Sequence, residues 1–387
     1  MGKKVKTFIL IDISLLLALL TIGFFYFYNN KASWYFLKND IMYASGMADA
    51  SYTDNYLSLD KTNWYSYNVL SDTEKIVYDE IYATIYEHGI IAEISTTDKA
   101  SLEYVYKCVF ADHGDIFWCN GCSISEKYVD DELVSLVFKP TYTMTLHERK
   151  KTSDDISQNV LSILKNAPTT GTDYEKIKFV FEYLAKNVTY DLSAPDNQNI
   201  KSVFLNKSSV CLGFSNAAQY LLSELGISST VVTGTLYNVP HSWNLVLLDG
   251  NYYYFDFTMA AAVVGSDFEY PDGYMNYSYF GLTDTELALT HDIEPLYELP
   301  SCNQVFGSYF YNEGLYFDGY DEATVANTIL QYHSNGAKCV SIKFTNKDAY
   351  YDAKRALCSE DRLSYYTEED YAYLSNMKHR ILTFCFE

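Results

Sequence analysis

Cys211, His241 and Asp256 are three residues whose types and spacing could support acyl transfer. Cys211 directly precedes the apolar stripe of a predicted helix, so it should lie at the helix N-terminus. The helix dipole and the free N–H groups at that end favour a thiolate, the nucleophilic form of cysteine, and can stabilise an oxyanion. A single cysteine at a helix end is more often a packing residue, so this position indicates little by itself.

A predicted β-hairpin connects the other two residues. Asp249-Gly250 is a strong signal for a two-residue turn, and the register that this turn sets makes His241 and Asp256 diagonal neighbours on one face. A diagonal gap of about 7–8 Å between backbones is within reach of an imidazole–carboxylate hydrogen bond. The carboxylate would fix the imidazole tautomer, and the opposite ring nitrogen would face the thiol. A three-residue loop would shift the register and separate the pair.

An alternative interpretation gives each residue an ordinary structural role. Cys211 would be a core residue, His241 would cap the segment after Pro240, and Asp256 would be solvated. For each residue alone this interpretation is favoured. For the three together, in the order Cys, His, Asp, we favour a catalytic triad.

The elements around these residues predict an α+β domain. Helices are expected first and strands afterwards, which distinguishes this order from an alternating α/β pattern. The expected helices cover 154–166, 173–187 and 211–226, and the expected strands cover 229–236, 241–248 and 251–258.

Three separated motifs in this region resemble the transglutaminase-like superfamily. Cys-Leu-Gly-Phe-Ser-Asn-Ala-Ala, beginning at Cys211, resembles its nucleophile helix. His-Ser-Trp-Asn, beginning at His241, and Tyr-Phe-Asp-Phe-Thr, around Asp256, resemble its His and Asp strands. The resemblance covers about 150–298, and Tyr190-Asp191 also fits the family's flanking pattern.

The resemblance implies a papain-like α+β core with a Cys-His-Asp triad, and the chain is identified as a bacterial member of this superfamily that an N-terminal segment is expected to anchor in the membrane. Cys211 would be the nucleophile, His241 the base and acid, and Asp256 the residue that orients the imidazole. Many bacterial members read Asp-Pro-Thr-Trp where this chain reads Asp-Phe-Thr-Met, so the local pocket is expected to differ. No cofactor and no metal are expected, since no acidic cluster suggests the calcium dependence of animal transglutaminases.

The motifs also suggest candidate residues for the substrate pocket. These are Trp243 and Asn244, which follow the predicted catalytic histidine, and Tyr190 in the flanking motif.

The beginning of the chain predicts a membrane anchor. Three lysines precede an almost unbroken apolar run over 8–28. As a helix this run would span about 31 Å, which matches the hydrocarbon core of a bilayer. The basic cluster predicts a cytoplasmic N-terminus, a single pass through the cell membrane and an extracellular remainder. A cleaved signal peptide is the alternative, but the run is long for one and no good cleavage site follows it.

The whole chain of 387 residues is expected to form several domains. Its formal charge of −22, from 28 basic and 50 acidic residues, disfavours binding to nucleic acid. The expected parts are a cytoplasmic tip and signal-anchor over 1–28, a spacer over 29–49, an α+β domain over 50–148, the catalytic domain over 149–299 and a small α/β sandwich over 300–387.

Both flanking domains show local signals. In the first, a capping box at 71–74 opens a helix, a second helix follows over 101–114, and 133–144 alternates like a strand. In the last, strands are expected over 315–317, 339–345 and 380–386, with helices beginning near 321, 346 and 367.

Eight cysteines are too few for a disulfide scaffold, and the sequence does not assign their pairing. Cys119 and Cys122 have CxxC spacing, but no second CxxC accompanies them, so a zinc site is disfavoured. A disulfide that closes a turn, or two ordinary thiols, is the preferred interpretation.

The sequence therefore predicts an extracellular thiol enzyme that acts on amide bonds of proteins or peptides, with cell-wall peptide as one candidate substrate. Whether water or an amine accepts the acyl group stays open. The alternative is a catalytically silent surface module that binds peptide or glycan through its many tyrosines, which number 39.

Overall fold

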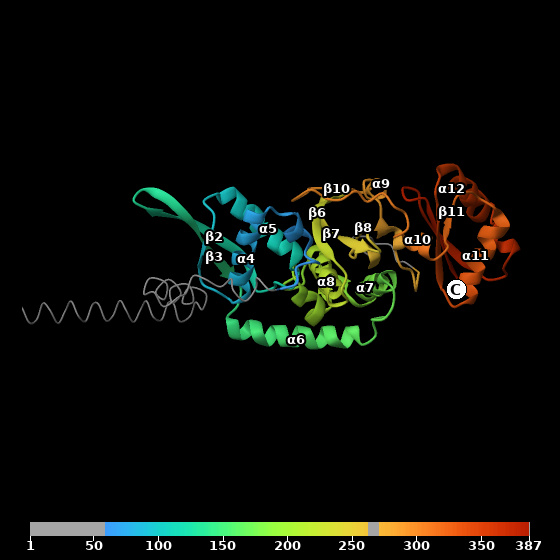
Figure 1. Cartoon of the computed structure of the whole chain (residues 1–387). Coiled ribbons are helices and arrows are strands. Elements are labelled where there is room, and N and C mark those ends of the chain that lie inside the picture. The colour runs from blue at the N-terminus through green and yellow to red at the C-terminus, as the bar shows by residue number, and fades with distance from the viewer. Residues whose placement is uncertain (1–58, 262–270, 387) are drawn as a thin grey trace, which may run out of the picture. The chain divides into compact units, whose positions relative to one another are not determined.

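A computed structural model describes residues 59–261 and 271–386 (Figure 1). These residues belong to two compact units. The first unit includes Ile76–Leu102 and Trp118–Lys150, and the second includes Asp60–Lys75, Glu103–Phe117 and Lys151–Glu387. The domain boundaries expected from the sequence remain predictions.

The predicted anchor and spacer over 1–49 lie outside the described residues. Within 59–261 and 271–386, no helix is both long and apolar enough to cross a membrane.

A three-stranded antiparallel sheet forms the centre of the first unit. Its order is β1-β3-β2, with bounds Ala92–Ile94, Glu132–Tyr142 and Cys119–Val129. Helix α4 (Asp72–Tyr86) begins at the predicted capping box, since the Ser71 and Glu74 side chains each accept a hydrogen bond from the other's backbone N–H. Helix α5 (Lys99–Asp112) continues from the first unit into the second.

The CxxC pair lies in strand β2, whereas the sequence predicts a turn there. Cys119-Asn-Gly-Cys122 lies within the strand, where the pairing register shifts between Cys119 and Gly121. The Asn-Gly dipeptide therefore forms a bulge rather than a turn. Both cysteines carry thiols, so the expected alternative of a turn-closing disulfide is wrong.

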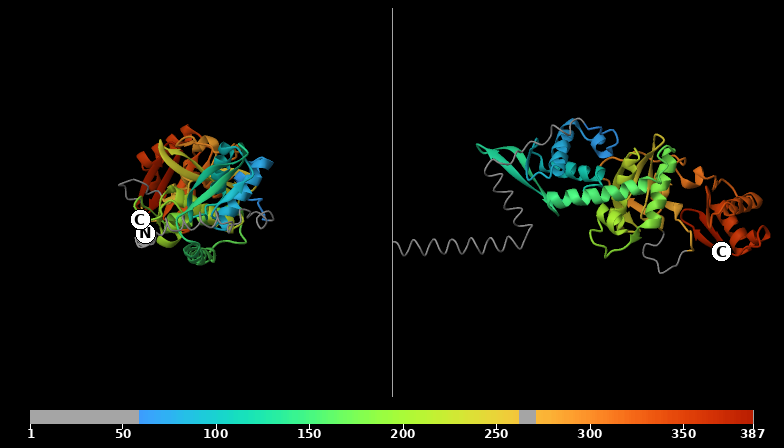
Figure 2. Two further views of the ribbon diagram at one scale, coloured as in Figure 1. Left: turned by 90° about the vertical axis from the view of Figure 1, so that its left-hand side faces the viewer. Right: turned by 90° about the horizontal axis from the view of Figure 1, so that it is seen from below.

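A five-stranded antiparallel sheet organises the second unit. Its order is β10-β6-β7-β8-β9, and helix α8 (Cys211–Glu224) packs against β6 and β7. The strand bounds are His291–Ile293, Ser229–Leu236, Val239–Leu248, Asn251–Phe255 and Phe280–Leu282. Helices α6 (Leu146–Leu164), seen lengthwise in the right-hand view of Figure 2, and α7 (Asp173–Asn187) precede these strands. The described chain is thus a mixed α and β fold with its helices first in this region.

The hairpin between β7 and β8 has the predicted register. Asp249 and Gly250 both have positive φ, at 48° and 80°, as a type I′ turn requires. Leu248 consequently pairs with Asn251, and every following pair up to Phe255 keeps this register. The two-residue turn therefore fixes which side chains of β7 and β8 share a face.

Tyrosine contributes strongly to packing in the described residues. Tyr78, Tyr253, Tyr254 and Tyr350 are among the largest fully buried side chains. These buried rings account for part of the tyrosine content without any binding role.

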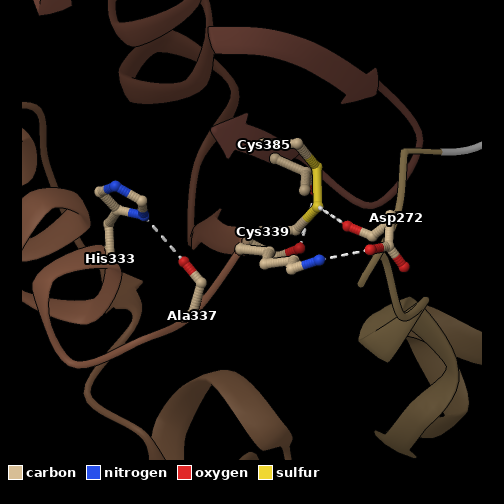
Figure 3. Close-up of a disulfide and its surroundings, with 8 residues drawn as sticks. Asp272, His333, Ala337, Cys339 and Cys385 are labelled. Carbon is tan, nitrogen blue, oxygen red and sulfur yellow. Dashed lines mark hydrogen bonds and ion pairs between the residues drawn. A yellow bond between two sulfur atoms is a disulfide. The ribbon is translucent and has the colours of Figure 1, made fainter. Parts of the chain in front are cut away.

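The C-terminal residues form a four-stranded sheet with order β11-β12-β14-β13, which with its helices is coloured from orange to dark red in Figures 1 and 2. The strands are Tyr316–Phe317, Cys339–Phe344, Ile381–Phe386 and Tyr371–Asn376, and the main helices are α11 (Glu322–Ser334) and α12 (Lys347–Ala353). A disulfide joins Cys339 to Cys385 across paired positions of β12 and β14 (Figure 3).

The prediction of a helix that begins at Thr367 is wrong. Residues Tyr371–Asn376 form the edge strand β13, which pairs with β14 along its whole length. Alternating tyrosines at 371 and 373 fit a strand, and this pairing outweighs the capping-box pattern at Thr367.

Candidate active site

Cys211 is the first residue of helix α8, as its position before the apolar stripe predicts. The preceding residue, Val210, has extended backbone and makes no side-chain cap. Its carbonyl accepts the Phe214 N–H at 3.0 Å, which closes the first turn. The N–H groups at this end are therefore not capped by the N-cap side chain, and the Leu212 N–H donates to the Cys211 sulfur.

The first turn of α8 is seated closely on the segment that precedes it. A Cβ placed on Gly213 would come within 1.9 Å of the Ser209 hydroxyl oxygen and 2.8 Å of the Asn197 carbonyl oxygen. Ser209 belongs to β5 (Ser208–Ser209), which pairs with β4 (Thr189–Tyr190). Glycine at 213 thus permits the close approach that positions the nucleophile helix.

His241 and Asp256 are hydrogen-bonded in the structure. The distance between His241 Nε2 and Asp256 Oδ2 is 2.8 Å, and the two side chains are only 6% and 0% exposed. The other carboxylate oxygen, Oδ1, accepts the backbone N–H groups of Thr258 and Met259 at 3.0 and 3.1 Å. These bonds hold the carboxylate in one orientation beyond the end of β8.

Electrostatics couple Cys211 to His241. Burial opposes the charged thiolate, but hydrogen bonding and charge interaction with His241, with help from Ser242, give Cys211 a lowered pKa. Burial likewise opposes the imidazolium, yet the Asp256 carboxylate and the thiol raise the pKa of His241 to about 10. Because Nε2 bonds Asp256, Nδ1 is the ring nitrogen left for the thiol. The arrangement favours a thiolate–imidazolium pair.

The structure adds His291, which the sequence did not suggest. Its Nε2 lies 3.3 Å from Asp256 Oδ2, and its Nδ1 lies 2.8 Å from the Thr290 hydroxyl oxygen. Burial raises the pKa of Asp256, but His241 and His291 together hold it well below the ordinary value. No local sequence motif indicates that His291 belongs to the site, because the pairing of β10 with β6 brings it there.

The suggested substrate-pocket residues of β7 are both buried. Trp243 and Asn244 are each 0% exposed. The Trp243 ring lies 4.7 Å from His291 and 6.2 Å from His241, and the Asn244 amide donates to the Ser215 carbonyl at 3.0 Å. Trp243 thus supports the imidazoles and Asn244 ties β7 to α8, while neither side chain presents surface to a substrate.

Tyr190 lies close to the reacting groups. Burial raises the pKa of its hydroxyl, and the charges of Cys211 and Asp256 raise it further. Its side chain is half-buried, so it keeps some exposure beside the thiol. Among the three suggested pocket residues, Tyr190 is the one with surface available to a substrate.

The two histidines and the aspartate also form a possible ligand set for a metal ion. Ligand atoms of His241, Asp256 and His291 lie within 4.8 Å of one another. Two imidazoles and a carboxylate are chemically suited to zinc. Both Nε2 atoms, however, already bond the same carboxylate oxygen, so an ion would have to replace these hydrogen bonds.

Comparison with known proteins identifies the region that holds these residues. Residues 163–257 match the family model described as the transglutaminase-like superfamily. No match was found among curated proteins.

Two solved structures share limited similarity with the chain. One is a crystal structure of a TGase, with 19% identity over 39% of this chain and 47% of that chain, at a TM-score of 0.27. Another is described as a putative cysteine protease from Cytophaga hutchinsonii, with 14% identity over 36% of this chain and 62% of that chain, at a TM-score of 0.25. The chain therefore spans less than two thirds of either structure. The family match over 163–257 includes Cys211, His241 and Asp256, and on this match the chain contains a transglutaminase-like superfamily domain.

Proposed function

We propose that this protein is an extracellular, membrane-anchored thiol enzyme that transfers or hydrolyses acyl groups at amide bonds of proteins or peptides. The observation that carries the proposal is the meeting of Cys211, His241 and Asp256, with 2.8 Å between the imidazole and the carboxylate. The thiol is half-buried rather than enclosed, as a nucleophile that receives a large substrate must be.

The first step forms a thioester. The Cys211 sulfur attacks the amide carbonyl carbon, and the carbonyl oxygen takes negative charge that N–H groups at the start of α8 stabilise. The C–N bond then breaks as the proton on His241 Nδ1 passes to the leaving amine. The products of this step are the free amine and an acyl group on Cys211.

The second step releases the acyl group. Water or a primary amine gives a proton to His241 Nδ1 as its oxygen or nitrogen bonds the acyl carbon, and the C–S bond breaks. The thiolate–imidazolium pair is then restored. Asp256 keeps the imidazole oriented through both steps, and His291 contacts the same carboxylate oxygen, Oδ2, that bonds His241.

The decisive experiment compares Cys211→Ala with the unchanged protein on a glutamine peptide, with and without a primary amine. Ammonia, cleaved peptide and amine adduct are measured separately, so that hydrolysis and cross-linking are distinguished. Cys211→Ala should abolish every activity, because the thioester cannot form. Cys358→Ala is the matched control, since Cys358 is also half-buried but burial raises its pKa to about 12.

Equal turnover by the unchanged and Cys211→Ala proteins would contradict the proposal. It would leave a silent peptide- or glycan-binding module as the favoured function.

The extracellular location is a separate part of the proposal. The lysines before the apolar run of 8–28 support it, and so does the disulfide between Cys339 and Cys385, because such bonds persist in oxidising compartments. Protease added to intact cells should degrade the chain, while a cytoplasmic marker protein stays whole. Full protection of the chain, with degradation only after lysis, would overturn this location.

A further inference from the structure

A cavity of about 660 Å³ lies within the second unit, beside the nucleophile helix. Four segments line it: α5 through Tyr106 and Phe110, α8 through Leu212, β6 through Val231 and Thr233, and the chain after β10 through Leu296. The volume lies within the range of about 300–1,000 Å³ that is usual for ligand pockets.

The cavity wall includes residues that adjoin the reacting thiol in the chain or across the sheet. Leu212, in its wall, directly follows Cys211 in α8. Thr233, also in its wall, pairs across the sheet with Ser242, and Ser242 hydrogen-bonds the Cys211 thiol. Neighbouring strands in a sheet are about 4.8 Å apart. Strand β6, which carries Thr233 in the wall, therefore lies about that distance from β7, which carries Ser242.

The cavity and the thiol also share one face of the sheet. Directly paired residues project to the same side, so Thr233 projects with Ser242. Ser242 faces α8, since its hydroxyl lies 3.2 Å from that of Ser215. The part of the wall that Thr233 contributes is therefore on the α8 face of the sheet, the face on which Ser242 contacts the Cys211 thiol.

The wall is largely apolar, although His113, Asn216 and Thr233 also line the cavity. Tyr106 and Phe110 pack with ring centroids 4.9 Å apart, and the side chains of Tyr106, Phe110, Leu212, Val231 and Leu296 are all half-buried. The two charged side chains at the cavity, Lys107 and Glu294, are exposed and of opposite sign. Burial of an apolar side chain against such a wall is favourable, and the two opposite charges give no preference for an acidic or a basic side chain.

We propose that this cavity binds an aromatic or branched aliphatic side chain of the peptide substrate, next to the amide that Cys211 attacks. The inference rests on the proposed function, because it assigns the occupant as part of the acyl donor. Much of the wall, from α5 and from the chain after β10, lies outside the family match over 163–257. The expected preference for an apolar side chain thus depends on parts of this chain outside the matched domain.

The test measures labelling of Cys211 by short peptides that carry a chloroacetamide group in place of the reacting amide. Two series place Phe, Leu, Gly, Asp or Lys on either side of that group. In one series, Phe and Leu peptides should label about ten- to a hundredfold faster than Gly, Asp or Lys peptides, since burial of one large apolar side chain has about that effect. Equal rates in both series, or faster labelling by Asp or Lys, would overturn the inference.

Val231→Trp should fill the cavity and remove the preference. The Phe peptide should then label no more than about threefold faster than the Gly peptide, well below the selectivity expected from burial. Iodoacetamide, which needs no side-chain pocket, should label Cys211 at an unchanged rate. Val129→Trp is the matched control, because Val129 is 51% exposed at the end of β2 and should keep the preference.

Loss of iodoacetamide labelling would show that Val231→Trp damages the active site itself. The comparison of Phe, Leu, Gly, Asp and Lys peptides on the unchanged protein would then decide whether the cavity binds an apolar side chain. Labelling requires no turnover. A protein that prefers apolar peptides but has no amide activity would therefore contradict the proposed function while supporting the cavity's role.

Discussion

The charge state of Cys211 depends on a carboxylate that it does not touch. Burial opposes a charge on His241, but Asp256 together with the thiol raises the pKa of His241 to about 10, and His241 in turn lowers the pKa of Cys211. The thiolate should therefore be present below the ordinary thiol pKa of about 8.5, and the imidazolium should persist up to about pH 10. Reactivity of Cys211 should reach its plateau within this window.

Asp256→Asn tests this coupling. The amide cannot stabilise the imidazolium, so the midpoint of Cys211 alkylation by iodoacetamide should move to higher pH. Turnover should fall by orders of magnitude, since a comparable change in a Ser-His-Asp enzyme costs about 10⁴. The measurement is the alkylation rate from about pH 5 to about pH 10, a range that includes the ordinary histidine and thiol pKa values. An unchanged midpoint would show that Asp256 does not set the thiol pKa.

His291 should act as a positioning residue for Asp256. Its hydrogen bond to a buried carboxylate is worth about 1.5–3 kcal/mol, so His291→Phe should reduce turnover roughly ten- to a hundredfold. The alkylation midpoint should also rise, and His291→Gln, which retains a donor, should restore part of both effects. His333→Phe, at a half-buried histidine paired with Glu369, is the control and should change neither. An effect of His291→Phe on stability alone would contradict a positioning role.

At the scale of elements, the seating of α8 on the preceding segment decides where the nucleophile lies. The space between Gly213 and Ser209 does not admit a methyl group, because the added Cβ would be 1.9 Å from the hydroxyl oxygen. The hydroxyl itself is engaged by Ser202 at 2.6 Å and by the Asn197 carbonyl at 2.8 Å. The segment therefore cannot easily yield to a larger residue.

Gly213→Ala should displace the helix start and disturb the site. Overpacking of this kind costs about 1–3 kcal/mol, and alkylation of Cys211 should slow as the thiol leaves His241. Thermal unfolding and the alkylation rate are measured together. Gly319→Ala is the control, because nothing lies within 4 Å of its added Cβ. Normal behaviour of Gly213→Ala in both assays would mean that the helix start can shift without cost.

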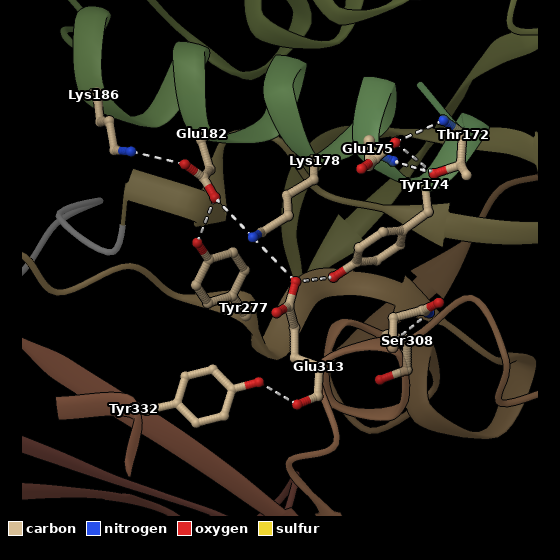
Figure 4. A network of polar contacts seen from close by, with 11 residues as sticks. Thr172, Tyr174, Glu175, Lys178, Glu182, Lys186, Tyr277, Ser308, Glu313 and Tyr332 are labelled. Atoms are coloured by element: carbon tan, nitrogen blue, oxygen red, sulfur yellow. Dashed lines mark hydrogen bonds and ion pairs between the residues drawn. The ribbon is translucent and has the colours of Figure 1, made fainter. Parts of the chain in front are cut away.

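At the scale of the whole described chain, polar contacts join the catalytic region to the C-terminal sheet. Lys178 of α7 lies 3.0 Å from Glu313 Oε1, which also accepts a hydrogen bond from the Tyr174 hydroxyl at 2.8 Å (Figure 4). The Tyr332 hydroxyl of α11 donates to the Glu313 carbonyl. A second connection is the ion pair between Glu286, in α9 (Asp284–Leu287), and Lys343 of β12. Both belong to the second compact unit, so we expect these parts to unfold together.

Lys343→Met tests the buried ion pair. Lys343 is 2% exposed, so its loss leaves the Glu286 carboxylate buried without its cation and should cost about 3–5 kcal/mol. Adding Glu286→Gln should recover part of this loss. Lys338→Met is the control, because Lys338 and Asp272 form an exposed pair worth about 0–1 kcal/mol (Figure 3). Equal effects of the two lysine substitutions on thermal unfolding would contradict the argument.

The stability difference should also depend on pH. Burial raises the pKa of Glu286, but Lys343 gives a net lowering, so its contribution is present above the unfolded pKa of about 4.3 and is lost as pH falls through the folded value. In Lys343→Met the buried Glu286 carboxylate lacks this cation, and protonation removes the free-energy cost of its unpaired charge. The unchanged protein should therefore lose its advantage progressively as the pH falls, first as the buried carboxylate of the variant takes up a proton above the ordinary glutamate pKa of about 4.3, and then as the unchanged protein's carboxylate does so below it.

The sequence could predict the parts of the site that local chemistry controls. The start of α8 at Cys211 follows from its apolar periodicity, and the register of β7 with β8 follows from the Asp249-Gly250 turn. Both signals act within a few residues, so no distant contact is needed to read them. The same local method failed at Thr367, where pairing with β14 outweighed a capping-box pattern.

By itself, the sequence determined the order of helices and strands around Cys211 and the register of the hairpin between His241 and Asp256, because periodicity and turn geometry are local. Asp256 lies just beyond the end of β8, so its meeting with His241 was decided by the tertiary structure. Only the tertiary structure decided that His291 completes the carboxylate's surroundings and that Trp243 and Asn244 are buried. It also assembled the cavity from four segments distant in the chain. Such contacts depend on which strands and helices pack together, and packing across long sequence separations leaves no periodic pattern in a single sequence.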